Sequence, residues 1–189
     1  MQDNKKLPEL SKSYPSTGSG RTDFIISLRD LIKDDALIIA EYAGDYDIAK
    51  MVATMPHPYS LEDAYAFLDK IKGQIKAGEG HSLAITFDGD FAGSIGWFYN
   101  EEHVLEIGYW VAKPYWGKGV ACKALALILE LVKVECADET EVLGNYMEEN
   151  PASGRVLEKN GFVRDGRGED CFSLARGEAR PAIRMLKKL

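Results

Sequence analysis

Residues 105–136 read L-E-I-G-Y-W-V-A-K-P-Y-W-G-K-G-V-A-C-K-A-L-A-L-I-L-E-L-V-K-V-E-C, and this stretch decides the fold. Its first seven residues alternate as in a strand: one face carries Ile107, Tyr109 and Val111, and the other carries Glu106, Gly108 and Trp110. From Val120 onward the apolar residues follow the spacing of one helix face instead. Gly117 and Gly119 lie between the two patterns. The sequence therefore predicts a strand, a short glycine turn and a long amphipathic helix.

The two glycines of this turn predict a binding site for an anion. Glycine tolerates a positive φ and lets a ligand approach the backbone closely. The helix that follows begins with unpaired N–H groups, and the positive end of its dipole points the same way. A phosphate group is the ligand that such a turn favours.

Composition and charge indicate a globular protein with an acidic surface. The chain has 189 residues, of which 46% are hydrophobic and 28% charged, so one domain with a sizeable core is expected. The formal net charge of −7 argues against nucleic acid or an anionic membrane as the main partner. Cationic substrates such as amines suit this surface better.

Cysteine usage and the absence of long apolar runs predict a cytoplasmic protein. Cys122, Cys136 and Cys171 are widely spaced and form no C-x-x-C pair, so neither a disulfide framework nor a metal site is predicted. No apolar run approaches the ~18 residues of a membrane span. The start M-Q-D-N-K-K lacks the apolar core of a signal peptide.

The chain divides into a polar N-terminal segment and one folded domain. Residues 1–22, which include S-K-S-Y-P-S-T-G-S-G, show no apolar periodicity and predict a flexible tail. The folded domain is expected from residue 23 to residue 189. It begins with a strand at F-I-I-S-L-R and a short helix at K-D-D-A-L-I-I-A-E-Y-A.

The middle of the chain predicts a helix and an antiparallel meander. Ser60 begins S-L-E-D, which has the spacing of a capping box, and the helix is expected to end before Gly78. Asp88-Gly89 is a hairpin turn signal between S-L-A-I-T-F and F-A-G-S-I-G-W-F-Y. A further turn at N-E-E leads into the strand at residue 105.

The last part of the chain predicts a crossover strand, a helix and closing strands. E-V-L-G-N-Y follows the central helix and is expected to lie parallel to the strand at residues 105–111. N-P-A-S-G-R-V-L-E-K-N predicts a helix with Pro151 in its first turn and Gly161 after its end. F-V-R, C-F-S-L and A-I-R-M-L-K indicate the closing strands. The order β-α-α-β-β-β-α-β-α-β predicts a mixed α/β sandwich.

The glycine turn resembles the acetyl-coenzyme A site of the GNAT acetyltransferase superfamily. The signature of that family is Gln/Arg-x-x-Gly-x-Gly/Ala, and the turn reads Trp116-Gly117-Lys118-Gly119-Val120-Ala121, with Trp116 in place of Gln or Arg. P-H-P-Y-S-L-E-D-A-Y-A-F-L, L-E-I-G-Y-W-V and N-P-A-S-G-R-V-L-E-K-N-G-F look like its RimJ/RimL-type branch, which acetylates protein N-termini. The resemblance covers roughly residues 23–174. It implies an α/β fold in which a meander and a splayed parallel strand pair surround the acetyl-coenzyme A site, with helices on both faces.

Glu106 is the candidate general base. It interrupts an apolar strand, where burial would raise the pKa of a carboxyl group toward neutrality. The resemblance implies the same role, because GNAT enzymes often use a glutamate at the matching position. The alternative is a carboxylate at a strand end that is solvated or paired with a lysine.

The resemblance also implies the residues that hold the cofactor. Backbone groups at Trp110, Val111 and Ala112 would hold the pantetheine arm and polarise the thioester carbonyl, while the turn from Trp116 to Ala121 would hold the pyrophosphate. Asn150 and Ser153 begin the next helix, where they can cap it and also approach the cofactor.

The sequence does not identify the residue that gives a proton to the departing thiolate. Many GNAT enzymes use a tyrosine at a position that falls on Leu157, which cannot donate a proton. Ser153, Tyr146 or a water molecule would then take its place, or the thiolate would leave unassisted.

The sequence predicts an N-acetyltransferase that uses acetyl-coenzyme A as co-substrate by direct transfer. Its acceptor is expected to be a protein N-terminal amine, with a small amine such as a polyamine as the alternative. A dinucleotide-binding oxidoreductase is disfavoured because Cys122 stands at the third glycine position. A non-catalytic module that binds an acyl-coenzyme A remains a competing interpretation. The protein is expected to be a monomer or a homodimer.

Overall fold

The antiparallel part of the sheet follows the chain order because short turns join its strands. The computed structural model describes residues 10–15 and 23–189, and within them the strands form one eight-stranded sheet in the order β1-β2-β3-β4-β5-β6-β8-β7. Neighbours are antiparallel except at the pair β5 and β6. The strand bounds are β1 Leu10–Tyr14, β2 Phe24–Asp30, β3 Gly80–Phe87, β4 Asp90–Tyr99, β5 Leu105–Val111, β6 Glu141–Met147, β7 Val163–Ser173 and β8 Glu178–Lys188.

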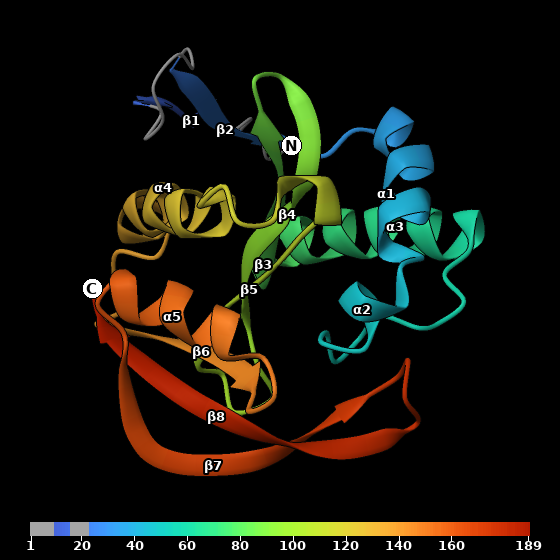
Figure 1. Ribbon diagram of the computed structural model, residues 1–189. Helices are drawn as coiled ribbons and strands as arrows, with labels where there is room; N and C mark the ends of the chain where they lie inside the picture. Colours follow the sequence, from blue (N-terminus) through green and yellow to red (C-terminus); the bar gives the residue numbers. More distant parts are fainter. Residues whose placement is uncertain (1–9, 16–22) are drawn as a thin grey trace.

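Helices cover both faces of this sheet (Figure 1). The helices are α1 Ala36–Ala43, α2 Tyr46–Ala49, α3 Leu61–Ala77, α4 Val120–Glu135 and α5 Pro151–Lys159, with two short 3-10 helices at Lys33–Asp35 and Lys113–Tyr115. The apolar stripe of α4 packs into the larger core, where Leu125 and Ile128 are fully buried with Ile107 of β5. A second core lies under α1 and α3 and includes Trp110 of β5. The two faces of β5 therefore belong to two different cores.

The predicted helix signals of the middle region are confirmed. Ser60 and Asp63 form a reciprocal capping box at the start of α3, where Asp63 N–H donates to Ser60 Oγ over 3.1 Å. The helix ends at Gly78, whose φ of 72° lies in the left-handed region. The hairpin turn at Asp88-Gly89 joins β3 and β4 as expected.

The parallel pair of strands separates after a very short contact. The register of β5 and β6 holds two partner pairs, Glu106 with Leu143 and Ile107 with Gly144. Beyond Ile107 the two strands diverge: β5 leads to the turn that precedes α4, and β6 ends near the start of α5 (Figure 1). The mixed sheet, the meander and the splayed parallel pair that the sequence predicts are therefore all present.

The N-terminal prediction is wrong for one short stretch. Residues 10–14, expected within a flexible tail, form β1 and pair along their whole length with β2. Tyr14 stacks on Phe24, with 6.0 Å between ring centroids, and the Lys123 ammonium lies 4.9 Å from the Tyr14 ring centroid. These contacts supply the apolar partners that the segment lacks locally. The rest of the expected tail, residues 1–9 and 16–22, lies outside the described residues.

The C-terminal strands also differ from the expected pattern. Most of F-V-R and C-F-S-L belongs to one long strand, β7, whose pairing with β8 shifts register between Arg164 and Gly168. The two strands form a hairpin at the edge of the sheet, at the bottom of Figure 1, and its turn reaches toward α2. None of the helices in the described ranges is long and apolar enough to cross a membrane.

Candidate active site

Two cavities lie beside β5 and meet where β5 and β6 separate. The larger cavity, of about 630 Å³, is bordered by the start of α4, the start of α5 and α2. The smaller cavity, of about 310 Å³, is bordered by α1, α3 and the β7–β8 hairpin. Residues that line both cavities mark the junction: Met51, Val52, Ile107, Gly108, Tyr109, Trp110, Asn145 and Tyr146. Because the sheet is open here, a molecule in one cavity can reach a molecule in the other.

The larger cavity begins at the glycine turn. Gly117 and Gly119 have φ values of +73° and +75°, a conformation that L side chains rarely adopt. Gly119 immediately precedes α4, so the first N–H groups of a 16-residue helix start at this point. The helix dipole adds a partial positive charge there. The turn therefore has the backbone geometry and the electrostatics that a phosphate group requires.

Two basic residues on α5 add positive charge to the same cavity. Arg155 and Lys159 both line it, and their spacing of four residues puts them on one face of the helix. The sequence interpretation missed both residues. Their spacing within R-V-L-E-K is the signal that could have found them, once the helix is placed beside the glycine turn.

The backbone of β5 presents alternate residues to the gap. Ala112 N–H donates to Ala92 O over 2.9 Å, so the backbone of Ala112 faces β4. Because successive residues of a strand direct their backbone groups to opposite edges, the groups of Val111 and Tyr109 face the gap beside β6. Val111 O accepts a hydrogen bond from Trp116 Nε1 over 2.6 Å, which agrees with this direction.

Most of the predicted cofactor residues line the larger cavity. Those that line it are Trp110, Val111, Trp116, Gly117, Gly119, Val120, Ala121, Asn150 and Ser153. Ala112 is fully buried in the core under α1 and α3, and its N–H pairs with β4. Lys118 directs its ammonium to the aromatic rings of Phe87 and Tyr115, 5.3 and 5.4 Å from their centroids. Ala112 and Lys118 lie outside the lining of this cavity, and their roles in holding a cofactor stay predictions.

At the start of α5, Asn150 caps the helix and Ser153 lines the cavity, whereas the sequence left both roles open for both residues. Asn150 is the N-cap, and its Oδ1 accepts from Ser153 N–H over 3.3 Å. The Ser153 hydroxyl is directed elsewhere, because its Oγ lies 2.9 Å from the hydroxyl oxygen of Tyr109. Leu157 is 1% exposed and packs in the larger core. The helix therefore presents Ser153, and not Leu157, to the cavity.

Tyr109 is a site residue that the sequence interpretation missed. It lines both cavities, and burial raises the pKa of its phenol to about 12. The sequence pattern placed it only on the same strand face as Ile107 and Val111. Its hydroxyl contact with Ser153 spans 44 positions of sequence, and no local pattern predicts such a contact.

Glu106 lies in the smaller cavity. Its Oε1 accepts a hydrogen bond from Asn145 Nδ2 over 3.0 Å. Burial raises the pKa of this carboxyl group, and hydrogen bonds from Asn145 and Asn100 together with the Arg184 charge oppose that shift. The raised pKa is the property that the sequence interpretation expected of a buried general base at this position.

The smaller cavity is hollowed over a pair of glycines. Gly96 of β4 lies opposite Gly108 of β5, and both line the cavity; a Cβ atom on Gly96 would collide with Ser82 Oγ. A Cβ atom on Gly108 would meet the Phe98 ring at 3.4 Å, so this part of the floor is closely fitted. Met55 and Phe67 contribute apolar walls. The cavity therefore suits a compact organic group with one cationic end near Glu106.

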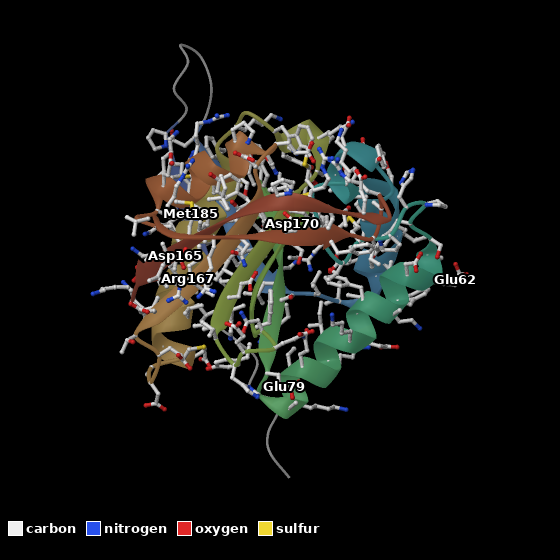
Figure 2. All side chains as sticks on the ribbon, turned by 90° about the horizontal axis from the view of Figure 1, so that it is seen from below. Glu62, Glu79, Asp165, Arg167, Asp170 and Met185 are labelled. Atoms are coloured by element: carbon white, nitrogen blue, oxygen red, sulfur yellow. The ribbon has the colours of Figure 1, made fainter. Side chains whose placement is uncertain are left out.

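The β7–β8 hairpin forms one wall of the smaller cavity. Its turn is bonded to the segment after α2: Leu174 N–H donates to Ala53 O, and Arg176 Nε donates to Lys50 O, each over 3.0 Å. Arg176 also pairs with Glu149. Figure 2 shows the hairpin, with Asp170 on it, crossing in front of the sheet opposite α3, which runs between Glu62 and Glu79. The hairpin is therefore held against the loop that borders both cavities.

Comparisons with known proteins agree on one family. The model of the family described as "Acetyltransferase (GNAT) domain" matches residues 26–163. The chain is similar to the SPbeta prophage-derived uncharacterized N-acetyltransferase YokL of Bacillus subtilis, at 26% identity over 152 residues, which cover 79% of this chain and 80% of that protein.

Solved structures with the same fold include RimJ and RimL. RimJ of Mycobacterium smegmatis, in complex with CoA-disulfide, superimposes with a TM-score of 0.73 at 20% identity over 87% of this chain and 82% of that chain. RimL, a ribosomal alpha-N-protein acetyltransferase in complex with coenzyme A, superimposes with a TM-score of 0.76 at 15% identity over 94% of this chain and 98% of that chain.

Proposed function

The chain belongs to the GNAT acetyltransferase family, and from that premise we propose that it transfers the acetyl group of acetyl-coenzyme A directly to the α-amine of a protein N-terminus. The observation that carries the proposal is the junction of the two cavities at the gap between β5 and β6. A donor in one cavity and an acceptor in the other can react there without a covalent enzyme intermediate.

The residues of the larger cavity fit coenzyme A. The glycine turn and the start of α4 offer N–H groups and positive charge to a pyrophosphate, and Arg155 and Lys159 offer further charge to its phosphates. The exposed backbone edge of β5 at Tyr109 and Val111 offers hydrogen bonds to an extended arm with amide groups. When bound, acetyl-coenzyme A supplies an activated thioester.

The roles of the chain's own residues follow from their positions. Glu106 accepts a proton from the acceptor ammonium, and Asn145 holds the carboxylate in place. The Val111 N–H is directed toward the gap, where it stabilises the negative charge that develops on the carbonyl oxygen. Ser153 contributes a hydroxyl on the sulfur side. The raised pKa of Glu106 suits this role, because a general base works best when its pKa lies near the working pH.

Two observations support a protein N-terminus as the acceptor. RimL, whose fold is similar, is described as a ribosomal alpha-N-protein acetyltransferase. The smaller cavity, of about 310 Å³, has apolar walls and Glu106 as a carboxylate partner for the amine. A second candidate is a compact free amine such as a polyamine. The observation in its favour is that the turn of the β7–β8 hairpin is bonded to residues 50 and 53. The hairpin forms a wall of the smaller cavity, which obstructs a long peptide more than a small amine.

Two measurements test the proposal. In a thermal-shift experiment, acetyl-coenzyme A at a hundred times its Kd is expected to stabilise the protein by about 2.7 kcal/mol, whereas NAD gives no shift. Thiol release is then followed with short peptides, with the same peptides blocked at the N-terminus, and with polyamines. Turnover with free but not blocked peptides supports the proposal. Turnover with polyamines alone selects the second candidate, and binding without turnover on any amine contradicts both.

A further inference from the structure

Tyr109 has a place in the site that the proposed chemistry leaves unused. It lines both cavities, whereas Glu106 lines only the smaller one and Ser153 only the larger one. Its hydroxyl oxygen lies 2.9 Å from Ser153 Oγ and 3.3 Å from Ser153 O. The phenol hydroxyl is therefore held beside Ser153 in the larger cavity, on the donor side of the junction.

We propose that the Tyr109 hydroxyl gives its proton to the sulfur as the thioester breaks, and that Ser153 is the residue that positions this hydroxyl. The inference rests on the proposed acetyl transfer. It assigns a proton donor in a chain whose Leu157 is buried in the core.

Other hydroxyl groups near the junction are less well placed. The Tyr146 ring lies beneath α5, where a Cβ atom on Gly154 would meet its Cζ atom at 2.6 Å. Its hydroxyl accepts a hydrogen bond from Arg164 NH2 over 3.3 Å. Ser153 carries an aliphatic hydroxyl, which is less acidic than a phenol. Of the two hydroxyls that contact each other, Tyr109 and Ser153, the phenol of Tyr109 is the more acidic.

The proton transfers balance over one turnover. Glu106 takes one proton from the acceptor ammonium and passes it to water. The free amine nitrogen then forms a bond to the acetyl carbon and loses its second proton to Glu106. The carbon–sulfur bond breaks, its electron pair goes to the sulfur, and the sulfur takes the Tyr109 proton. Glu106 then releases its proton to water, and the Tyr109 phenolate takes one from water directly or through Ser153. The products are the amide and free coenzyme A.

The acidities of the two groups set the size of the expected effect. The phenol of Tyr109 has a pKa of about 12, and an ordinary thiol has one of about 8.5. Transfer from the phenol to a fully formed thiolate is therefore uphill, so the effect falls at the lower end of general acid catalysis, about 10²-fold.

Kinetics of matched tyrosine variants give the first test. Tyr109→Phe is expected to lower kcat about 10²-fold while the Kd for acetyl-coenzyme A stays within about twofold. Tyr99→Phe is the control, since Tyr99 lies on the neighbouring strand β4, outside both cavities, with a pKa also raised to about 12. Its kcat is expected to be unchanged. An unchanged kcat in Tyr109→Phe overturns the proposal.

Two further variants separate the neighbouring hydroxyls. Ser153→Ala keeps the helix cap, because Asn150 accepts from the backbone N–H of residue 153. Its kcat is expected to fall less than that of Tyr109→Phe. A larger loss in Ser153→Ala, or in Tyr146→Phe, would move the proton donor to that residue and overturn the proposal.

A titration without any acceptor gives the second test. The thiol of bound coenzyme A is titrated by its thiolate absorbance in the wild type and in Tyr109→Phe. If the phenol donates to the thiolate, the bound thiol has a pKa at least about one unit lower in the wild type, because a hydrogen bond to the charged form favours that form. Equal titrations overturn the proposal. Absence of turnover in the wild type contradicts only the proposed function, because this titration still reports the contact.

Discussion

Replacing Glu106 by Gln tests the assignment of the general base without changing the shape of the site. Asn145 Nδ2 donates to Glu106 Oε1 over 3.0 Å, and the amide oxygen of a glutamine can accept the same bond. What the variant loses is the ability to take a proton from the acceptor amine. A positioned general base contributes about 10²- to 10⁴-fold, which corresponds to roughly 2.7–5.5 kcal/mol of activation free energy.

The expected result combines lost turnover with retained donor binding. Since Glu106 lines only the smaller cavity, kcat/KM for the amine is expected to fall by that factor while the Kd for acetyl-coenzyme A is unchanged. In the wild type, kcat/KM rises with pH through the raised pKa of Glu106, because only the ionised carboxylate accepts a proton. This acidic limb is expected to disappear in the variant. Steady-state kinetics from pH 5 to pH 9 measure both effects.

The same variant is expected to be more stable than the wild type near neutral pH. The folded pKa of Glu106 is raised above its unfolded value, so folding favours the protonated form. Its contribution to stability is fully present below the unfolded pKa and is lost as the pH rises through the folded pKa. Glu106→Gln removes this pH-dependent loss, so its free energy of unfolding exceeds that of the wild type at pH 7–8 and converges with it under acidic conditions.

A matched control makes the outcome decisive. Glu102→Gln changes an exposed carboxylate in the turn before β5 and is expected to leave the rate and stability unchanged. Wild-type kcat/KM in Glu106→Gln, with its acidic limb intact, would refute the assignment of Glu106. A loss of acetyl-coenzyme A affinity as large as the loss of rate would refute the separation of the two cavities.

Three further changes test the turn, the charge beside it and the helix α3. Gly119→Ala forces an L residue to a φ of +75°, so the protein should lose about 1–2 kcal/mol of stability in denaturant unfolding and bind acetyl-coenzyme A more weakly. Arg155→Gln should weaken acetyl-coenzyme A binding and reduce its salt dependence in calorimetry, whereas an unchanged salt dependence would exclude a phosphate contact. Gly73→Ala should raise the melting temperature through a gain of about 0.5–1 kcal/mol, because Gly73 lies in the interior of α3 and a Cβ atom there meets nothing within 4 Å.

Local signals account for what the sequence predicted well. The glycine turn, the capping box at Ser60 and the hairpin at Asp88-Gly89 each depend on neighbouring residues, so they could be identified without knowledge of the fold. The splayed pair β5 and β6 followed from the family resemblance combined with the crossover rule.

Long-range contacts account for what the sequence missed. The role of Ala112 depends on which edge of β5 it faces, and only the bond to Ala92 on β4 fixes that direction. The contact of the Lys118 ammonium with the rings of Phe87 and Tyr115 joins residues that lie far apart or on different elements, so the sequence did not predict it. The contact of Tyr109 with Ser153 requires that α5 pack against the gap beyond the end of the parallel pairing. Each of these depends on tertiary packing, which single-sequence periodicity does not contain.

The early separation of β5 and β6 has a consequence for how such a protein can change its substrate. The helices α4 and α5 border one cavity, and α1, α3 and the C-terminal hairpin border the other, so the two halves of the reaction are built from different parts of the chain. Substitutions on α3 or in the hairpin can therefore reshape the acceptor chamber while the phosphate-binding turn stays intact. Residues that line both cavities, such as Tyr109 and Gly108, are different, because a substitution there affects donor and acceptor together. One small domain can therefore change the amine it accepts and still bind the same acetyl donor.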